Sequence, residues 1–169
     1  MPRRQILSQS ERSSLLALPD DEMTLTRMAY FSEQDLALIN THRKPANRFG
    51  FSVLLCYLKN IGMIPDKKSL PSDFLLKHIA SRLNLSKELW QDYASVRDTT
   101  RREHLIELYH YLGLKKFTKQ IQNDCISYLT PLATRTDKGI LLAKEFLKYI
   151  QQNRVIIPSI DVLKNSRST

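Results

Sequence analysis

The 169-residue chain has only two cysteines, Cys56 and Cys125, which are far apart and lie in apolar surroundings. Two isolated thiols cannot form the disulfide framework of a small secreted domain, so we expect buried free cysteines in a reducing compartment. The chain also lacks any run of 18 apolar residues and any apolar segment near its N-terminus. These absences argue against a membrane-spanning helix and a secretory signal peptide, and they predict a cytoplasmic protein.

Signatures of catalysis are missing as well. The sequence contains no glycine-rich phosphate loop, no GxSxG elbow, and no HExxH or CxxC motif. His104, Glu107 and His110 are close in sequence, but on a helix their side chains point in different directions and do not converge on a metal ion. We therefore expect no enzymatic activity, no metal and no cofactor in this segment.

Strand-like alternation is absent, whereas apolar residues recur at helical spacing along the chain. This pattern predicts an all-α fold of two small helical bundles that contain helix-turn-helix-like units. We expect a first bundle over 1–61, a linker over 62–71, a second bundle over 72–165 and a polar tail over 166–169. The linker is predicted because a glycine, two prolines and several charges gather in one short stretch.

Capping residues and prolines mark the expected helix starts. Helices are expected near Ser8, Pro19, Ser32, Ser72, Ser86, Asp98, Thr118, Asp137 and Pro158. Gly113 is expected to end the helix that starts at Asp98. The stretch 48–58 is apolar on almost every side, which is typical of a buried helix. Such a helix cannot lie lengthwise in a DNA groove, so only its N-terminal end could contact DNA.

Positive charge is in excess, with 26 Lys and Arg against 17 Asp and Glu and a formal net charge of +9. Residues 114–169 carry 10 of the cations and 4 of the acids. An excess of this kind favours a polyanionic partner, either nucleic acid or an acidic membrane surface. The alternative is a solvated surface that keeps the protein soluble.

One candidate binding motif surrounds Pro45 and consists of Arg43, Lys44, Asn47 and Arg48. Here one predicted helix ends and the buried one begins, with the spacing of a helix-turn-helix. The cations could hold phosphates, and Asn47 could pair with an adenine edge. In the alternative, Arg43 and Lys44 complement a helix C-terminus, and Arg48 pairs with Glu33 or Asp35.

A second candidate motif surrounds the predicted helix start at Asp98 and consists of Arg97, Thr100, Arg101 and Arg102. Arg97 and Arg101 are like charges four residues apart, which a helix does not favour unless an anion lies nearby. Asp98 and Arg102 form an opposite-charge pair at the same spacing, so Arg102 also has a structural interpretation. In the functional interpretation, the residues of this motif contact phosphates or bases.

Two lesser candidates lie near the ends of the chain. Arg3 and Arg4 form a short basic arm of the kind that enters a minor groove, although a disordered terminus explains them equally well. Lys144 and Lys148 lie on the polar side of a helix over 138–152. They could follow a DNA backbone or simply be solvated.

Several longer motifs resemble one protein family. They are MPRRQILSQSERSSLLALP at 1–19, NRFGF at 47–51, LCYL at 55–58, the pattern Y-x3-R-x-x-TR-x-EHL at 93–105, and TDKGILLA at 136–143. In this order and spacing they resemble the N-terminal region of replicative transposases of the Tn-three family, from residue 1 to about residue 163.

This resemblance implies an all-helical region that recognises the terminal inverted repeats of a transposon. It carries DNA contacts over to both arginine motifs and, in the last motif, to Thr136 and Lys138, where Asp137 could instead be a helix cap. Family catalysis uses a DDE carboxylate triad with Mg²⁺ in a later domain that these residues do not include. The implied partners are double-stranded DNA, the rest of a transposase chain and, for a dimer, a second copy.

A different reading of the same residues is a protein-interaction module. Tyr and Leu side chains on the 138–152 helix could mediate transposase dimerisation or docking of another domain. Under this reading the chain would form a salt-resistant oligomer without DNA, whereas the DNA-binding reading predicts strong dependence on salt.

Overall fold

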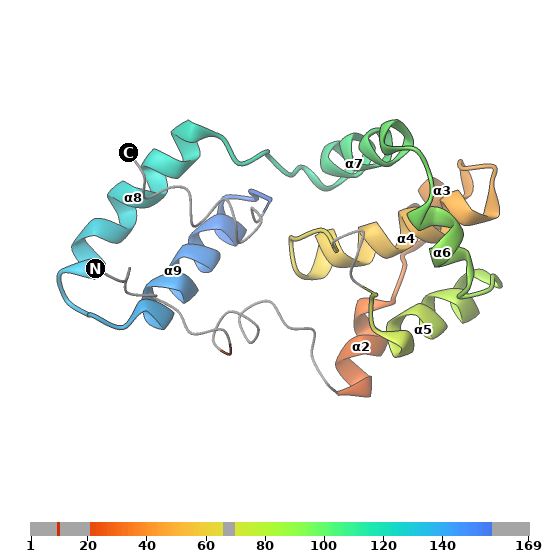
Figure 1. The fold of residues 1–169 in the computed structure, drawn as a ribbon, viewed down its shortest axis with the longest axis horizontal. Helices are drawn as coiled ribbons and strands as arrows, with labels where there is room; N and C mark the ends of the chain where they lie inside the picture. The colour runs from red at the N-terminus through yellow and green to blue at the C-terminus, as the bar shows by residue number, and fades with distance from the viewer. Residues whose placement is uncertain (1–9, 11–20, 66–69, 157–169) are drawn as a thin grey trace. The chain divides into compact units, whose positions relative to one another are not determined.

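The computed structural model describes Ser10 and residues 21–65 and 70–156, and within these ranges the chain is all-α, as predicted. The described helices are α2 (Glu22–Met28), α3 (Glu33–Asn40), α4 (Pro45–Asn60), α5 (Asp73–Leu83), α6 (Leu89–Ala94), α7 (Asp98–Leu112), α8 (Lys119–Ala133) and α9 (Gly139–Gln152) (Figure 1). In the same ranges the only β-type pairing is an isolated bridge between Lys115 and Val155. The helices expected after Ser8 and Pro158 lie outside the described residues.

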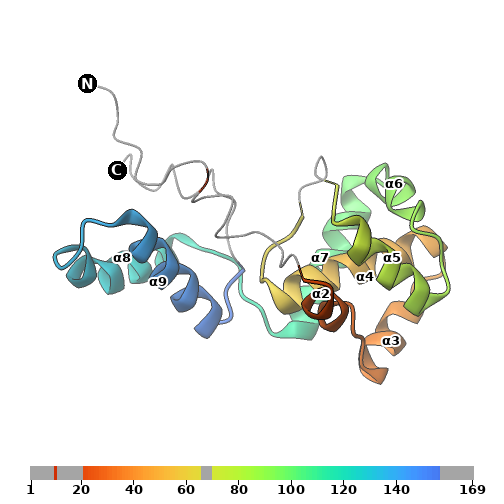
Figure 2. The ribbon, with the colours of Figure 1, turned by 90° about the horizontal axis from the view of Figure 1, so that it is seen from below.

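The described residues 21–112 belong to one compact unit, and residues 113–156 belong to a second. This grouping differs from the expected division, because α4 and α5, on either side of the expected linker, belong to the same unit. The reason is the composition of α4, whose ten residues from Phe49 to Leu58 are all buried. A helix that is apolar on every side needs cover on every side. Helices α2 and α3 provide part of that cover, and α5, α6 and α7 provide the rest (Figures 1 and 2).

The contact between α4 and α6 depends on Gly50. A Cβ atom at this position would overlap the ring of Tyr93, which is itself 1% exposed. The absence of a side chain therefore lets α6 approach the α4 backbone, and Trp90 and Tyr93 fill the space beside it. Cys56 is buried in the same core as a free thiol, as predicted, and burial raises its pKa to about 12.

Several predicted helix ends are confirmed. Ser32 and Asp35 form a capping box at the start of α3, and the Thr118 side chain accepts a hydrogen bond from the Ile121 amide at the start of α8. Helix α7 has the predicted bounds, and Gly113 follows it with φ at +65°, in the left-handed region that glycine adopts readily.

Two predicted caps are wrong. Helix α6 begins at Leu89 with Glu88 in the N-cap position, because the Ser86 hydroxyl donates to the Glu88 carboxylate instead of capping the helix. Helix α9 begins at Gly139 with Lys138 in the N-cap position, so Asp137 does not cap it. There the Thr136 hydroxyl accepts a hydrogen bond from the Lys138 amide at 3.2 Å.

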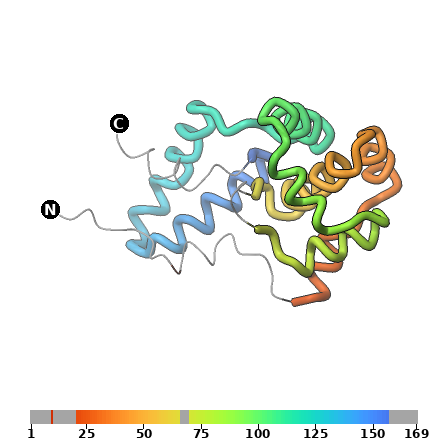
Figure 3. The backbone as a smooth tube through the Cα atoms, turned by 45° about the vertical axis from the view of Figure 1, so that its right-hand side comes forward, coloured from red at the N-terminus to blue at the C-terminus, as the bar shows by residue number. Residues whose placement is uncertain are grey.

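In the described part of the second unit, α8 and α9 run side by side in opposite directions (Figure 3). The Lys115 amide donates to the Arg154 carbonyl at 2.8 Å, and the Ile156 amide donates to the Lys115 carbonyl at 2.9 Å. These two bonds join the segments before α8 and after α9. Cys125 of α8 and Ile150 of α9 are buried, whereas Ile126, Tyr128 and Leu141 stay 50%, 43% and 44% exposed.

Candidate nucleic-acid interface

The first basic motif lies where the chain turns from α3 into α4. Arg43 and Lys44 are exposed, and Lys44 occupies the N-cap position of α4 without forming a side-chain cap. Asn47 and Arg48 lie in the first turn of α4 and are half-buried. The alternative pairing of Arg48 with Glu33 or Asp35 is not found among the ion pairs of the described residues, where Asp35 binds Lys59. The turn therefore presents cations at a helix N-terminus, where backbone N–H groups already favour an anion.

The second motif splits into an outer and an inner part at the start of α7. Arg97 and Arg102 are exposed, whereas Thr100 and Arg101 are half-buried. The Nη2 atom of Arg101 donates to the carbonyl of Pro65 at 2.7 Å, and its Nη1 atom is buried without a hydrogen-bond partner among the described residues. The guanidinium of Arg101 therefore faces the protein and ties α7 to the segment that follows α4.

A cluster of aromatic rings brings the two motifs together. The ring of His42, which directly precedes Arg43, lies 4.3 Å from the ring of Phe51 and 4.6 Å from that of His104 in α7. Tyr93 Oη and His104 Nδ1 share a hydrogen bond of 2.9 Å. The α3–α4 turn is thereby fixed against the first half of α7.

Burial determines the charge state of His104. The side chain is 4% exposed, and desolvation, with a smaller contribution from His42, lowers its pKa to about 4. The ring is therefore neutral at physiological pH, and its contacts with Tyr93 and Phe51 require no counter-ion. These contacts give His104 a structural role in the packing of α7 against α4 and α6.

His42 also approaches an acid on α7. Its Nε2 atom lies 3.3 Å from Oε2 of Glu107, but the geometry is not that of a hydrogen bond, and this nitrogen has no other partner among the described residues. The contact holds the turn before Arg43 beside the middle of α7. The first basic motif and the helix that carries the second are therefore held together in the same unit.

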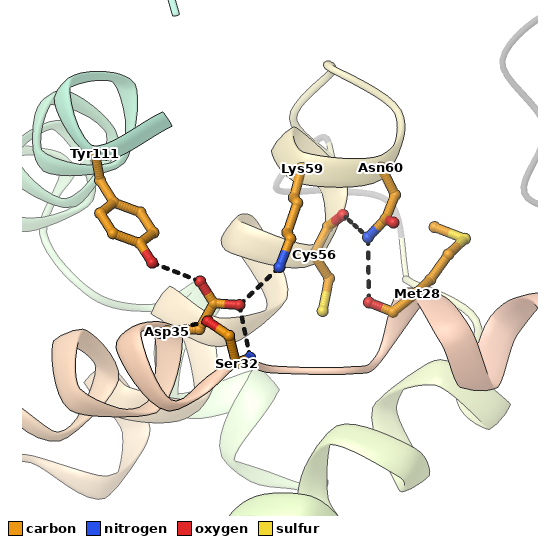
Figure 4. Close-up of polar contacts among 7 residues, drawn as sticks. All are labelled: Met28, Ser32, Asp35, Cys56, Lys59, Asn60 and Tyr111. Atoms are coloured by element: carbon orange, nitrogen blue, oxygen red, sulfur yellow. Dashed lines mark hydrogen bonds and ion pairs between the residues drawn. The ribbon is translucent and has the colours of Figure 1, made fainter. Parts of the chain in front are cut away.

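A buried carboxylate joins α3, α4 and α7 (Figure 4). Asp35 is 2% exposed and accepts hydrogen bonds from Lys59 Nζ at 2.7 Å, from Tyr111 Oη at 2.7 Å and from the Ser32 amide at 3.0 Å. Desolvation alone would raise its pKa, but together these donors hold the pKa below the usual 3.8. Nearby, the side-chain amide of Asn60 donates to the Met28 carbonyl at 3.1 Å.

The remaining candidate residues lie elsewhere. Lys138 is exposed at the N-terminus of α9, in the second unit. Lys144 and Lys148 are also exposed on α9, one helical turn apart. Arg3 and Arg4 lie outside the described residues.

Sequence reasoning missed His42, Asp35 and Gly50 as parts of this arrangement. The single usable signal was the position of Asp35 three residues after Ser32, which is the spacing of a capping box. Nothing in the local sequence links His42 to His104 across 62 positions. The structure also reports two absences within its described residues: no group of three or more His, Cys, Asp or Glu could hold a metal ion, and no helix could cross a membrane.

These features define a class: an all-helical segment with exposed cations at two helix starts, built on one buried central helix. A family described as a domain of unknown function, DUF4158, matches residues 6–168, and the chain belongs to this family. It is 56% identical over 166 residues to the transposase for transposon Tn2501 of Escherichia coli, 43% identical over 166 residues to that for Tn21 of the same species, and 41% identical over 169 residues to that for Tn501 of Pseudomonas aeruginosa.

These matches cover 98% of the chain for the first two relatives and 99% for the third, but only 17% of each relative. The chain corresponds to the N-terminal region of transposases of the Tn-three family, as its motifs indicated. Because it spans about one-sixth of the length of these relatives, it represents a small part of such a protein.

Proposed function

We propose that this chain binds double-stranded DNA in a sequence-specific manner at the terminal inverted repeats of a transposon. It would act without catalysis of its own and present the transposon end to the remainder of a transposase. The observation that carries the proposal is the contact of His42 with His104, because it holds the turn with the first basic motif against the helix that carries the second. The proposal draws further support from the names of the relatives, which are all transposases.

The exposed cations of the two basic motifs suit DNA. Arg43, Lys44 and Arg97 are exposed cations that can hold phosphates and so set the register of the protein on a duplex. Lys144 and Lys148 of the second unit add phosphate contacts that carry no sequence information. The carboxylate of Glu107 lies against His42, 3.3 Å from its Nε2 atom.

A fluorescence-anisotropy titration tests this function. The probes are a duplex that carries the terminal inverted repeat of Tn2501 and a scrambled duplex of equal composition, each at about 50 and 200 mM salt. Between these two concentrations a protein with 6 to 10 phosphate contacts loses roughly 10³-fold or more in affinity. We expect a preference for the repeat that survives the higher salt. Equal binding to both probes at both concentrations would contradict specific end recognition.

A second candidate function is protein interaction through the α8–α9 unit. Ile126, Tyr128 and Leu141 are large apolar side chains that stay about half exposed there. Exposed apolar groups of this size are common at interfaces between proteins. Sedimentation of the chain without DNA at high salt separates the two functions, since a stable oligomer supports interaction and a monomer supports DNA binding alone.

A further inference from the structure

The helix that follows the α3–α4 turn cannot be the one that reads DNA bases. In a helix-turn-helix the second helix lies in the major groove and contacts base edges. Here that helix is α4, and its residues from Phe49 to Leu58 are buried in the core. Outside this stretch α4 reaches the surface at its first turn, where Asn47 and Arg48 are half-buried, and at its last two residues. Of these last two, Lys59 binds Asp35 and Asn60 donates to the Met28 carbonyl. If this unit reads a sequence, another helix must present the side chains.

Helix α7 carries a stripe of exposed side chains along one side, as a helix that reads bases needs. Its members are Thr99, Arg102, Glu103, Ile106 and His110, all exposed. At 3.6 residues per turn they lie within an arc of about 100°, over about 16 Å of helix. The opposite side of the helix is buried at His104 and Leu108. A major groove about 12 Å wide accepts one helix, and a stripe of this length can meet four or five base pairs.

The stripe is also held rigidly, which base reading requires. His104 shares a hydrogen bond with Tyr93 of α6, and Tyr111 donates a hydrogen bond to Asp35 of α3. Arg101 donates to the Pro65 carbonyl after α4. These three bonds fix α7 at its start, middle and end, so its exposed side chains project from a backbone that three neighbouring segments position.

We propose that α7 is the helix that enters the major groove and reads the bases, an assignment that rests on the DNA-binding function proposed above. Arg102 can donate two hydrogen bonds to a guanine, Glu103 can accept one from the amino group of a cytosine, and Ile106 can contact a thymine methyl group. Ile106 is 52% exposed, which places an apolar group of the right kind at the centre of the stripe.

Charge favours DNA over a protein as the occupant of this stripe. Arg43 and Lys44 follow His42, whose ring contacts His104 of α7, and Arg97 precedes the first turn of α7. These cations are suited to holding phosphates on either side of a groove that contains the helix. The carboxylate of Glu103 would be repelled by a phosphate, but it can accept a hydrogen bond from a cytosine amino group. The proposed contacts thus combine cations for the phosphates with polar, acidic and apolar side chains for the bases.

The test measures a specificity ratio, the Kd for the scrambled duplex divided by that for the duplex with the Tn2501 inverted repeat. The variants are Arg102→Ala, Glu103→Gln and Ile106→Ala, with Arg82→Ala as the matched control, an exposed arginine on α5. We expect each stripe variant to lower the ratio about 5- to 100-fold and the control to leave it unchanged. Thermal denaturation should show that these exposed substitutions leave the fold intact.

Chemical protection adds a readout that affinity cannot give. Dimethyl sulfate methylates guanine N7 in the major groove, and the wild-type chain should protect a guanine of the repeat that Arg102→Ala leaves reactive. Retention of the full ratio in all three stripe variants, together with its loss in Asn47→Ala, would overturn the assignment of α7 while leaving DNA binding intact. A wild-type ratio of one would overturn both proposals. A salt-resistant dimer that Ile106→Ala dissociates would assign the stripe to a protein contact instead.

Discussion

Replacing the buried Asp35 by alanine should destabilise the protein more than replacing any of the exposed charged residues described above. The carboxylate is 2% exposed and accepts hydrogen bonds from Lys59, Tyr111 and the Ser32 amide. It therefore connects three helices at once, and its removal leaves three donors without their acceptor.

The expected magnitude follows from the exposure of those donors. Removing one partner of a fully buried ion pair costs about 3–5 kcal/mol, because the other charge is stranded. Here the Lys59 side chain is 38% exposed and can be hydrated after the change, so the lower end of that range applies. We expect a loss of about 3 kcal/mol for Asp35→Ala and about 1 kcal/mol for Tyr111→Phe, which removes one hydrogen bond.

Urea denaturation followed by circular dichroism measures both losses. The matched control is Asp73→Ala, since Asp73 is also a carboxylate in the first turn of a helix with two lysine partners, Lys77 and Lys87. Its side chain is 54% exposed, so its pairs are screened by water and its loss should be clearly smaller. Equal losses for Asp35→Ala and Asp73→Ala would refute the reasoning that burial makes the Asp35 hydrogen bonds contribute more to the free energy of unfolding.

Three further outcomes are expected. Burial lowers the pKa of His104 to about 4, so as the pH falls below about 6.5 the histidine takes up a proton in the unfolded chain before it does so in the folded one. The free energy of unfolding should therefore decline between about pH 6.5 and 4, by at most ~1.4 kcal/mol per pH unit. Denaturation of the His104→Gln variant should lack this decline. Gly50→Ala should lower the denaturation midpoint strongly because its Cβ meets Tyr93, with partial recovery on combination with Tyr93→Leu. Lys144→Gln with Lys148→Gln should weaken binding to specific and scrambled DNA alike and reduce the salt slope by about 2.

Much of the fold could be predicted because it follows from local pattern. The all-α class, the bounds of α7 and the burial of the 48–58 segment all come from apolar spacing and capping residues near one another in the chain. The division into bundles could not be predicted in the same way. Gly, Pro and charge in 62–71 favoured a linker, but the need of α4 for cover on every side kept the helices after it in the same unit.

The candidate site was less accessible to sequence reasoning for a physical reason. Clusters of arginine show where an anion could bind, but they do not show which guanidinium points outward. Arg101 was expected to contact DNA, and in the structure it donates to the Pro65 carbonyl, a group 36 positions earlier. Contacts over such separations depend on how the helices pack, and a local charge pattern does not encode them.

Arg101 and Arg102 show how one motif can serve two purposes. Neighbouring residues on a helix differ by about 100° in direction, so a pair of arginines at the edge of a packed helix must divide between the protein and the solvent. The inner one fixes α7 against the chain after α4, and the outer one faces outward on the helix so fixed. Loss of Arg101 should therefore weaken DNA binding through stability, and loss of Arg102 should weaken it through specificity. Denaturation and the specificity ratio, measured on Arg101→Ala and Arg102→Ala together, distinguish the two roles.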